Sequence, residues 1–364
     1  MSRRNKRLRQ NRLNRIAKQK NRLEAKKFKH RNKRRRKSLI WGLSLLAILF
    51  VLSIIVFFGS EFIVDRLATA EENEVEAHTT LETEESSVDE DKDLEKDIQA
   101  EVKTSTKNER ENKKDRAIKN SGLLESEIKT YLRKNGINLY DFGFVYKNLE
   151  TGVELEINGD EVFLAASVMK VPINVLAYDL TVDGLDLDEK LTYYENDYEG
   201  GTGILQGEKI GSSYPISELL TLMITESDNV ATNIMYRYLG NYNQEYLLTT
   251  LARVYDISSY NGNYITPNES VNILERIYYN EDNNPHYDTL LDDMKNTSYN
   301  DYFTRELKGI EIAHKTGDYD GYYNDFGIVY DDEPFIFAIF TDNLSHATNV
   351  LADIGKIVYD GHIE

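Results

Sequence analysis

Three short groups of polar residues in this 364-residue chain have side chains that could together activate a serine nucleophile. Ser167 and Lys170 are three positions apart, so both side chains would lie on one face of a helix. The groups Ser227–Asn229 and Lys315–Gly317 follow in that order. A serine hydroxyl becomes a good nucleophile only when a neighbouring base takes its proton, and a desolvated lysine can be that base. The three groups together predict a serine nucleophile activated by lysine chemistry.

Each group also suggests what its members would do. A second cation at Lys315 would lower the pKa of Lys170 further, and Ser227 could relay a proton to a leaving nitrogen. Asn229 can hold a substrate amide, while Lys315 and Thr316 can bind a carboxylate. Gly317 lets a substrate backbone approach the edge of a strand. The backbone N–H groups of Ser167 and Asp318 are the predicted donors to a developing oxyanion.

Taken alone, each group has a simpler interpretation. Ser167 could be an ordinary helix N-cap, Ser227–Asn229 a cap or turn, and Lys315–Gly317 a surface lysine before a turn. The chain also repeats the patterns elsewhere, so that one pattern by itself decides nothing: the further pairs are Ser126 with Lys129, Ser259 with Asn261, and Ser298 with Asn300. The order of the three groups and their flanking residues favour the catalytic interpretation.

Residues 118–364 resemble the class A β-lactamases, the penicillin-recognising serine hydrolase family. The trio of motifs is typical of that family, and the flanking residues agree with it: Phe163–Ala166, Val171-Pro172, Thr266-Pro267 and Asn324-Asp325. The resemblance implies a nucleophile at Ser167, its base at Lys170 and a proton relay at Ser227. It also implies substrate contacts from Asn229, Lys315, Thr316, Gly317 and Asp318, and no cofactor.

Two departures from the family bear on turnover. Class A β-lactamases carry a loop whose glutamate activates the deacylating water, but the corresponding stretch Ile257–Asn268 is short and has no carboxylate. Asp318 stands where the family usually has a small residue. We therefore expect an acyl-enzyme with β-lactams or D-Ala-D-Ala-type peptides, and slow hydrolysis unless Glu195 or Asp197 replaces the glutamate. The alternative is a non-hydrolytic penicillin-binding or wall-sensing protein with the same fold.

Periodicity outlines the folded region. A helix is predicted near Ser121–Lys134, followed by strands at Asp141–Asn148 and Glu154–Ile157. Helices should fill most of residues 167–310. Two more strands, Phe326–Tyr330 and Phe335–Thr341, should precede a last helix at about Ser345–Tyr359. This order predicts an α+β, β-lactamase/transpeptidase-like fold, an antiparallel sheet with helices packed on it.

The N-terminal third is organised differently. Residues 1–37 hold 19 lysines and arginines and one acidic residue. Residues 38–60 carry no charge, and this stretch is long enough for a membrane-spanning helix. The long basic region argues against a cleaved signal peptide, despite Ala68-Thr69-Ala70. We predict a cytoplasmic tail, a transmembrane signal-anchor, and an acidic stalk at 61–117 that is disordered or transiently helical. The catalytic domain would then lie outside the membrane.

Other candidates are weaker. The tail could contact anionic lipid, but only Phe28 could stack on a base, so no specific nucleic-acid partner is expected. Cysteine is absent, and the four histidines of the domain lack metal-ligand spacing, so no metal site is predicted. Three tyrosines before residues 200–203 could line the mouth of an active-site cleft, or could be ordinary surface and packing residues of a tyrosine-rich domain: Tyr193, Tyr194 and Tyr198.

Overall fold

The computed structural model of the chain describes residues 89–241, 243–259 and 262–363. The residues from Asp89 onward form one compact unit. The predicted basic tail and membrane span lie outside the described residues. Within the described part, no helix combines the length and the apolar composition that crossing a membrane requires. The tail, span and stalk boundaries therefore stay predictions.

The centre of the unit is a five-stranded antiparallel sheet in the order β2-β1-β9-β8-β7. The predicted α+β class with an antiparallel sheet is confirmed. The strand that carries Lys315–Gly317 is longer than the apolar run before the motif suggests, so the motif lies within an edge strand. The bounds are β1 Phe142–Asn148, β2 Glu154–Ile157, β7 Glu311–Tyr319, β8 Tyr322–Tyr330 and β9 Phe335–Asp342.

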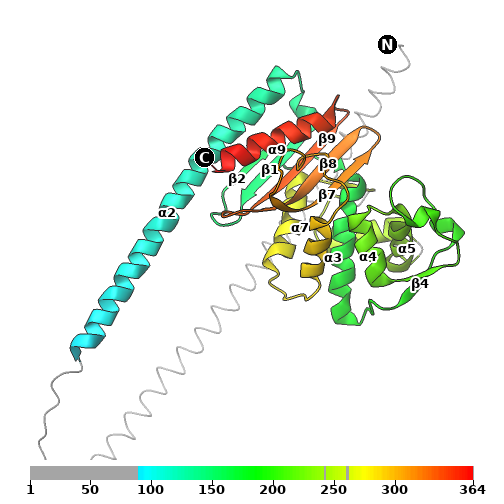
Figure 1. The fold of residues 1–364 in the computed structure, drawn as a ribbon, viewed down its shortest axis with the longest axis horizontal. Helices are drawn as coiled ribbons and strands as arrows, with labels where there is room; N and C mark the ends of the chain where they lie inside the picture. Colours follow the sequence, from blue (N-terminus) through cyan, green and yellow to red (C-terminus); the bar gives the residue numbers. More distant parts are fainter. Residues whose placement is uncertain (1–88, 242, 260–261, 364) are drawn as a thin grey trace, which may run out of the picture. The chain divides into compact units, whose positions relative to one another are not determined.

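Two helices, α2 (Asp89–Lys134) and α9 (Ala347–Ile363), pack against each other on one face of the sheet (Figure 1). Their apolar stripes and the sheet enclose a core in which the Phe303 and Phe337 rings stack 3.8 Å apart. The first helix begins at Asp89, well before the predicted start at Ser121. Its upstream half has no glycine or proline and is rich in Glu and Lys, which have high intrinsic helix propensity.

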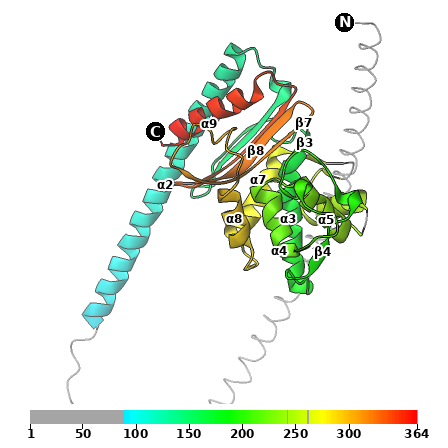
Figure 2. The same ribbon diagram turned by 45° about the vertical axis from the view of Figure 1, so that its right-hand side comes forward.

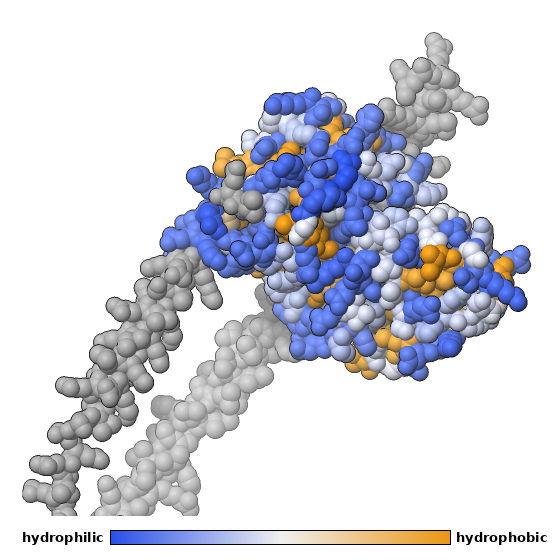
Figure 3. Space-filling model, viewed as in Figure 1, coloured by the Kyte–Doolittle hydropathy of each residue, from blue (hydrophilic) through white to orange (hydrophobic). Residues whose placement is uncertain are grey.

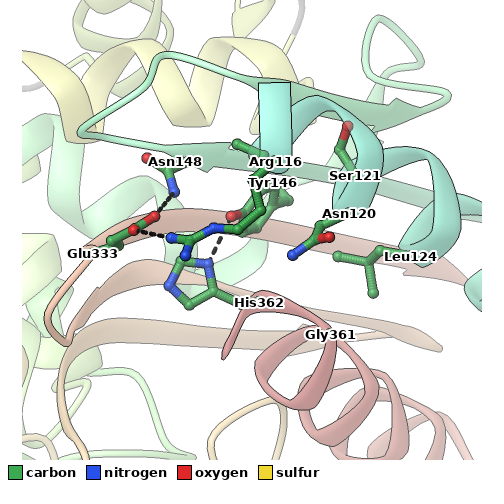
Figure 4. A pocket seen from close by; sticks show the side chains of 10 residues that line it. Arg116, Asn120, Ser121, Leu124, Tyr146, Asn148, Glu333, Gly361 and His362 are labelled. Carbon is green, nitrogen blue, oxygen red and sulfur yellow. Dashed lines mark hydrogen bonds and ion pairs between the residues drawn. The ribbon is translucent and has the colours of Figure 1, made fainter. Parts of the chain in front are cut away.

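The side chain of Arg116 ties α2 to the turn between β8 and β9 (Figure 4). Arg116 forms an ion pair with Glu333, which also accepts a hydrogen bond from Asn148 Nδ2 at 3.2 Å. Beside it, the Tyr146 hydroxyl and His362 Nδ1 are 2.7 Å apart. Arg116 thus joins α2 to the β8–β9 turn, which is itself bonded to β1, while Tyr146 and His362 join β1 to α9.

The other face of the sheet carries the helical half of the molecule (Figure 2). A central helix, α3, is buried along most of its length and contacts α4, α6 and α8, while α7 and α8 pack on the sheet. The helices of this half are α3 Lys170–Leu180, α4 Ile216–Thr225, α5 Asn229–Leu239, α6 Gln244–Val254, α7 Pro267–Tyr279 and α8 Tyr287–Lys295.

Short elements connect the two halves. Strand β3 (Phe163–Leu164) pairs with β6 (Tyr264–Ile265), and β4 (Lys190–Thr192) pairs with β5 (Ser213–Pro215). The face of the unit shown in Figure 3 is mostly hydrophilic, with small separate apolar patches. Strand β3 leads directly into the turn that carries Ser167, so the β3–β6 pair fixes that turn between sheet and helices.

Candidate active site

Ser167 lies in a 3₁₀ turn, Ala166–Met169, that runs directly into α3. The serine is therefore neither a helix N-cap nor part of the α-helix, whereas Lys170 is the first residue of α3. Ala166, just before it, has a φ of 50°, in the left-handed region that alanine rarely adopts. Such backbone costs about 1–3 kcal/mol and persists only where surrounding structure imposes it. The nucleophile candidate is thus held by a constrained turn.

Lys170 is buried, with 4% of its surface exposed, and its ammonium group points to the Ser227 motif. Lys170 Nζ donates to the Ser227 carbonyl oxygen at 2.5 Å, to Ser227 Oγ at 3.2 Å and to Asn229 Oδ1 at 3.0 Å. Burial, and then the nearby Lys315, hold the pKa of Lys170 well below its usual range. A lysine whose pKa is lowered gives up its proton more readily and can then act as a base.

Lys315 is completely buried and approaches the same hydroxyl from β7. Its Nζ donates to Ser227 Oγ at 3.1 Å and to the Thr316 carbonyl oxygen at 2.8 Å. Burial lowers the pKa of Lys315 to about 8, opposed by the carboxylates of Asp325 and Asp318. At neutral pH this group therefore remains mostly cationic.

The hydroxyl of Ser227 stands between these two amines. A hydroxyl has one proton and two lone pairs, so it can accept a hydrogen bond from each lysine and still donate its own proton. When Lys170 is neutral, its lone pair can instead accept the Ser227 proton. The hydroxyl can then recover a proton from Lys170 after giving up its own, which is what a proton relay needs.

Gly317 brings β7 against the turn of the nucleophile. A Cβ at this position would lie 2.8 Å from the Ala165 carbonyl oxygen and from Val168 N, and 2.9 Å from Ser167 N. Such distances are shorter than real Cβ contacts, and all three neighbours are backbone atoms. The absence of a side chain at Gly317 thus allows the predicted oxyanion donors, Ser167 N–H and Asp318 N–H, to lie on adjoining segments.

Two asparagines hold the same turn from other elements. Asn324 Nδ2, completely buried on β8, donates to the carbonyl oxygens of Leu164 at 2.8 Å and Ala165 at 3.2 Å. Asn263 Nδ2, just before β6, donates to the Ala166 carbonyl oxygen at 3.0 Å. Asn263 and its role escaped the sequence analysis because a single amide in a loop carries no distinguishing pattern.

The second motif is anchored by the loop of residues 200–205. Thr202 Oγ1 donates to the Ser227 carbonyl oxygen at 2.7 Å, and Asn229 Nδ2 donates to the Gly200 carbonyl oxygen at 3.1 Å. The buried Asp228 accepts from Leu205 N and Ala231 N, both at 2.8 Å, the second as the N-cap of α5. Because Ser227 has a φ of 49°, its backbone is also left-handed.

The other serines and the tyrosines noted in the sequence have different surroundings. The repeat serines do not join the site: Ser126 is exposed on α2, Ser259 Oγ donates to the Leu248 carbonyl oxygen, and Ser298 Oγ donates to Glu226. Of the tyrosines, Tyr193 is buried, whereas Tyr194 and Tyr198 are about half exposed. Tyr299, which the sequence analysis did not single out, lies with its ring centroid 5.8 Å from Lys315 Nζ.

Of the two carboxylates named as possible deacylating bases, Glu195 is exposed in the 3₁₀ turn Glu195–Asp197. Asp197 is buried and accepts two hydrogen bonds from Arg237, at 2.8 and 3.0 Å. Next to the short loop, Glu269 binds the N–H and hydroxyl of Ser258 and caps α7. No carboxylate from the described part of Ile257–Asn268 reaches the nucleophile, since that stretch contains none.

His314 has a structural environment. Its Nδ1 lies 2.9 Å from Asp325 Oδ1 and its Nε2 lies 2.9 Å from Asn300 Oδ1. Both its ring nitrogens are thus engaged inside the protein, on the side of β7 opposite to the Lys315 side chain. Among the described residues, no group of three or more His, Cys, Asp or Glu side chains is placed to hold a metal ion.

Comparison with known proteins agrees with this geometry. Residues 123–361 match the model of the beta-lactamase enzyme family, which is about two thirds of the chain, so the protein belongs to that family. A comparison with curated protein sequences gives no match.

Solved structures share the fold. PBP-A is 27% identical with a TM-score of 0.59, and the match covers 66% of this chain and 96% of that one. A point mutant of PBP-A, determined as an acyl-enzyme complex with penicillin G, matches equally well over 66% and 97% of the two chains. The TLA-3 extended-spectrum β-lactamase is 22% identical over 67% of this chain and all of the other, with a TM-score of 0.58, which supports the fold alone.

We expect Gly317→Ala to slow the acylation of the protein by penicillin G about a hundredfold while leaving it folded. The new methyl group must push the Ser167 turn away, and a displacement of about 1 Å at reacting groups costs rates of that order. Gly207→Ala is the matched control, because nothing lies within 4 Å of the added Cβ. Equal acylation rates for both variants, measured by intact mass, would contradict the close approach.

The acylation rate constant should depend on pH in a bell-shaped manner. It should rise as Lys170 loses its proton and becomes a base, and fall above about pH 8 as Lys315 loses the charge that binds a carboxylate. The check is the second-order rate constant for penicillin G from pH 5 to 10. A rate that keeps increasing beyond pH 9.5 would show that the charge of Lys315 is not required.

Proposed function

We propose that this protein is a membrane-anchored serine hydrolase that forms an acyl-enzyme at Ser167 with β-lactams or with D-Ala-D-Ala-type cell-wall peptides. The observation that carries the proposal is the convergence of two buried lysines on the Ser227 hydroxyl, next to the turn of Ser167. A solvated helix cap or a surface lysine would not have such surroundings.

The reaction would begin with Lys170, in its neutral form, taking the Ser167 hydroxyl proton. A bond forms between Ser167 Oγ and the substrate carbonyl carbon, and the oxyanion is stabilised by the N–H groups of Ser167 and Asp318. The carbon–nitrogen bond then breaks. The leaving nitrogen takes the proton of Ser227, which recovers one from Lys170, so that Lys170 is neutral again in the acyl-enzyme. Lys315 and Thr316 would bind the carboxylate of the substrate.

Hydrolysis of that ester is the step for which the site is least equipped. The carboxylate-free stretch Ile257–Asn268 supplies no base, and Asp197 is paired with Arg237. We infer that deacylation is slow, so that the protein behaves more like a penicillin-binding protein than like an efficient β-lactamase. The sequence identity to PBP-A (27%) is higher than that to the TLA-3 β-lactamase (22%), which supports this inference. A penicillin-binding sensor that releases no product is the second candidate, favoured by the same missing base.

Exposure to penicillin G should add the mass of one penicillin to the protein, and Ser167→Ala should abolish the adduct. Ser126→Ala, which removes the exposed serine of the other S-x-x-K pattern, is the matched control and should acylate normally. Intact mass followed over time gives both the adduct and its lifetime, which we expect to be hours.

Two results would change this assignment. Loss of the adduct within seconds, with penicilloate appearing, would mean an efficient β-lactamase with a base not identified above. An adduct that persists in Ser167→Ala would place the nucleophile elsewhere.

We further propose that residues 38–60 anchor the protein in the cell membrane, with the basic tail inside and the catalytic domain outside. The chain has no cysteine, so single cysteines report topology without interference. A membrane-impermeant maleimide should label Lys308→Cys, at an exposed position, on intact cells. It should label Ser2→Cys only after lysis. Labelling of both, or of Ser2→Cys alone, on intact cells would rule out this orientation.

A further inference from the structure

The residue after the Lys315–Gly317 motif is an aspartate whose side chain remains exposed. Asp318 is on β7, opposite Tyr323 of β8, and directly follows the glycine that touches the Ser167 turn. The backbone N–H of Asp318 is already assigned to the oxyanion. The carboxylate has no role in that chemistry, so its presence beside the reacting groups needs a separate explanation.

The carboxylate of Asp318 lies close to where a substrate would place its own carboxylate. Side chains two positions apart on a strand point to the same side, so Thr316 and Asp318 share one side of β7 and are separated by about 6.5–7 Å along it. A carboxylate held by Lys315 and Thr316 would therefore meet a second negative charge at about that distance. At the mouth of a cleft, such a like-charge pair changes an association rate constant by about three- to tenfold.

A tyrosine lies beside the carboxylate. Burial and the charge of Asp318 raise the pKa of the Tyr302 hydroxyl above its usual range, so that this hydroxyl keeps its proton. The Tyr302 ring packs edge-on against Tyr323, the residue opposite Asp318 on β8, with ring centroids 6.0 Å apart. The Asp318 carboxylate therefore has a protonated phenol close to it.

The charge of Asp318 acts on both lysines of the site. It opposes the loss of the proton from Lys315 and from Lys170. On Lys170 the carboxylates of Asp228 and then Glu199 act in the same direction; Glu199, in the loop before Gly200, accepts a hydrogen bond from Asn233 at 2.8 Å. On Lys315 the larger opposing charge is that of Asp325. Asp318 is therefore one of several carboxylates that surround the two buried cations.

We propose that Asp318 is a charge-selecting residue of the Ser167 site, one that disfavours doubly anionic ligands and favours ligands that carry an ammonium group. This inference rests on the proposed acylation of Ser167. It assigns the substrate to cell-wall peptides with a free amino group near the scissile bond, rather than to peptides with an additional acidic side chain there.

Three penicillins with the same fused ring test this selection. The side chain of ampicillin carries an α-ammonium group, that of carbenicillin an α-carboxylate, and that of penicillin G neither. The full-length protein in detergent is compared with Asp318→Asn, which removes the charge and keeps the backbone N–H. Asp320→Asn, an exposed aspartate two residues further along, is the matched control that removes the same charge outside the motif.

The readout is the ratio of acylation rate constants, variant over wild type, for each penicillin, because intrinsic reactivity cancels in that ratio. For Asp318→Asn at low salt we expect an increase of about three- to tenfold with carbenicillin, a smaller increase with penicillin G, and no increase or a decrease with ampicillin. The differences should shrink at about 0.5 M salt, since screening weakens exposed charges. Asp320→Asn should give ratios near one throughout.

Equal ratios for the three penicillins in Asp318→Asn would overturn the inference while leaving the proposed function intact. The same pattern in Asp320→Asn would overturn it too, because the effect would then belong to overall charge. Failure of all three penicillins to acylate the wild-type protein would overturn the proposed function and this inference with it.

Discussion

The desolvation of two lysines around one serine hydroxyl is the interaction on which the rest of the site depends. Lys170 and Lys315 approach Ser227 Oγ from the first residue of α3 and from an edge strand, far apart in sequence. Burying two amines together is unfavourable unless their hydrogen bonds are satisfied or one of them is neutral. The carbonyl oxygens of Ser227 and Thr316 and the amide of Asn229 satisfy them in part.

The surrounding fold can be understood as the structure that keeps those amines in place. The sheet supplies an edge strand with no side chain at Gly317, and the helical half supplies α3 and the start of α5. Where the two halves meet, the chain adopts left-handed backbone at Ala166 and Ser227, two residues that normally avoid it. Local strain at these residues coincides with the site rather than with ordinary turns, which suggests that packing of the two halves imposes it.

The sequence predicted the parts of this arrangement that leave a pattern. The order of the motifs and the periodicity around them were enough for the fold class and for the proximity of Lys170, Ser227 and Lys315. The supporting contacts of Asn263 and Thr202 were not predictable, because they depend on how separate loops cross. The start of α2 at Asp89 was not predicted, because the stretch before Ser121 lacks the apolar spacing of an amphipathic helix, although its Glu- and Lys-rich composition has high helix propensity.

The helix α2 also determines how the domain is rotated about the helix axis. Arg116 and the buried residues near the C-terminal end of α2 join it to the sheet, so the catalytic unit turns with the helix. Its 46 residues span about 69 Å, and each residue adds about 1.5 Å of length and 100° of rotation. Inserting one residue upstream of Arg116 would therefore barely change the distance from the start of α2 to the Ser167 site. It would, however, rotate that site by about 100° around the helix axis relative to the start of α2.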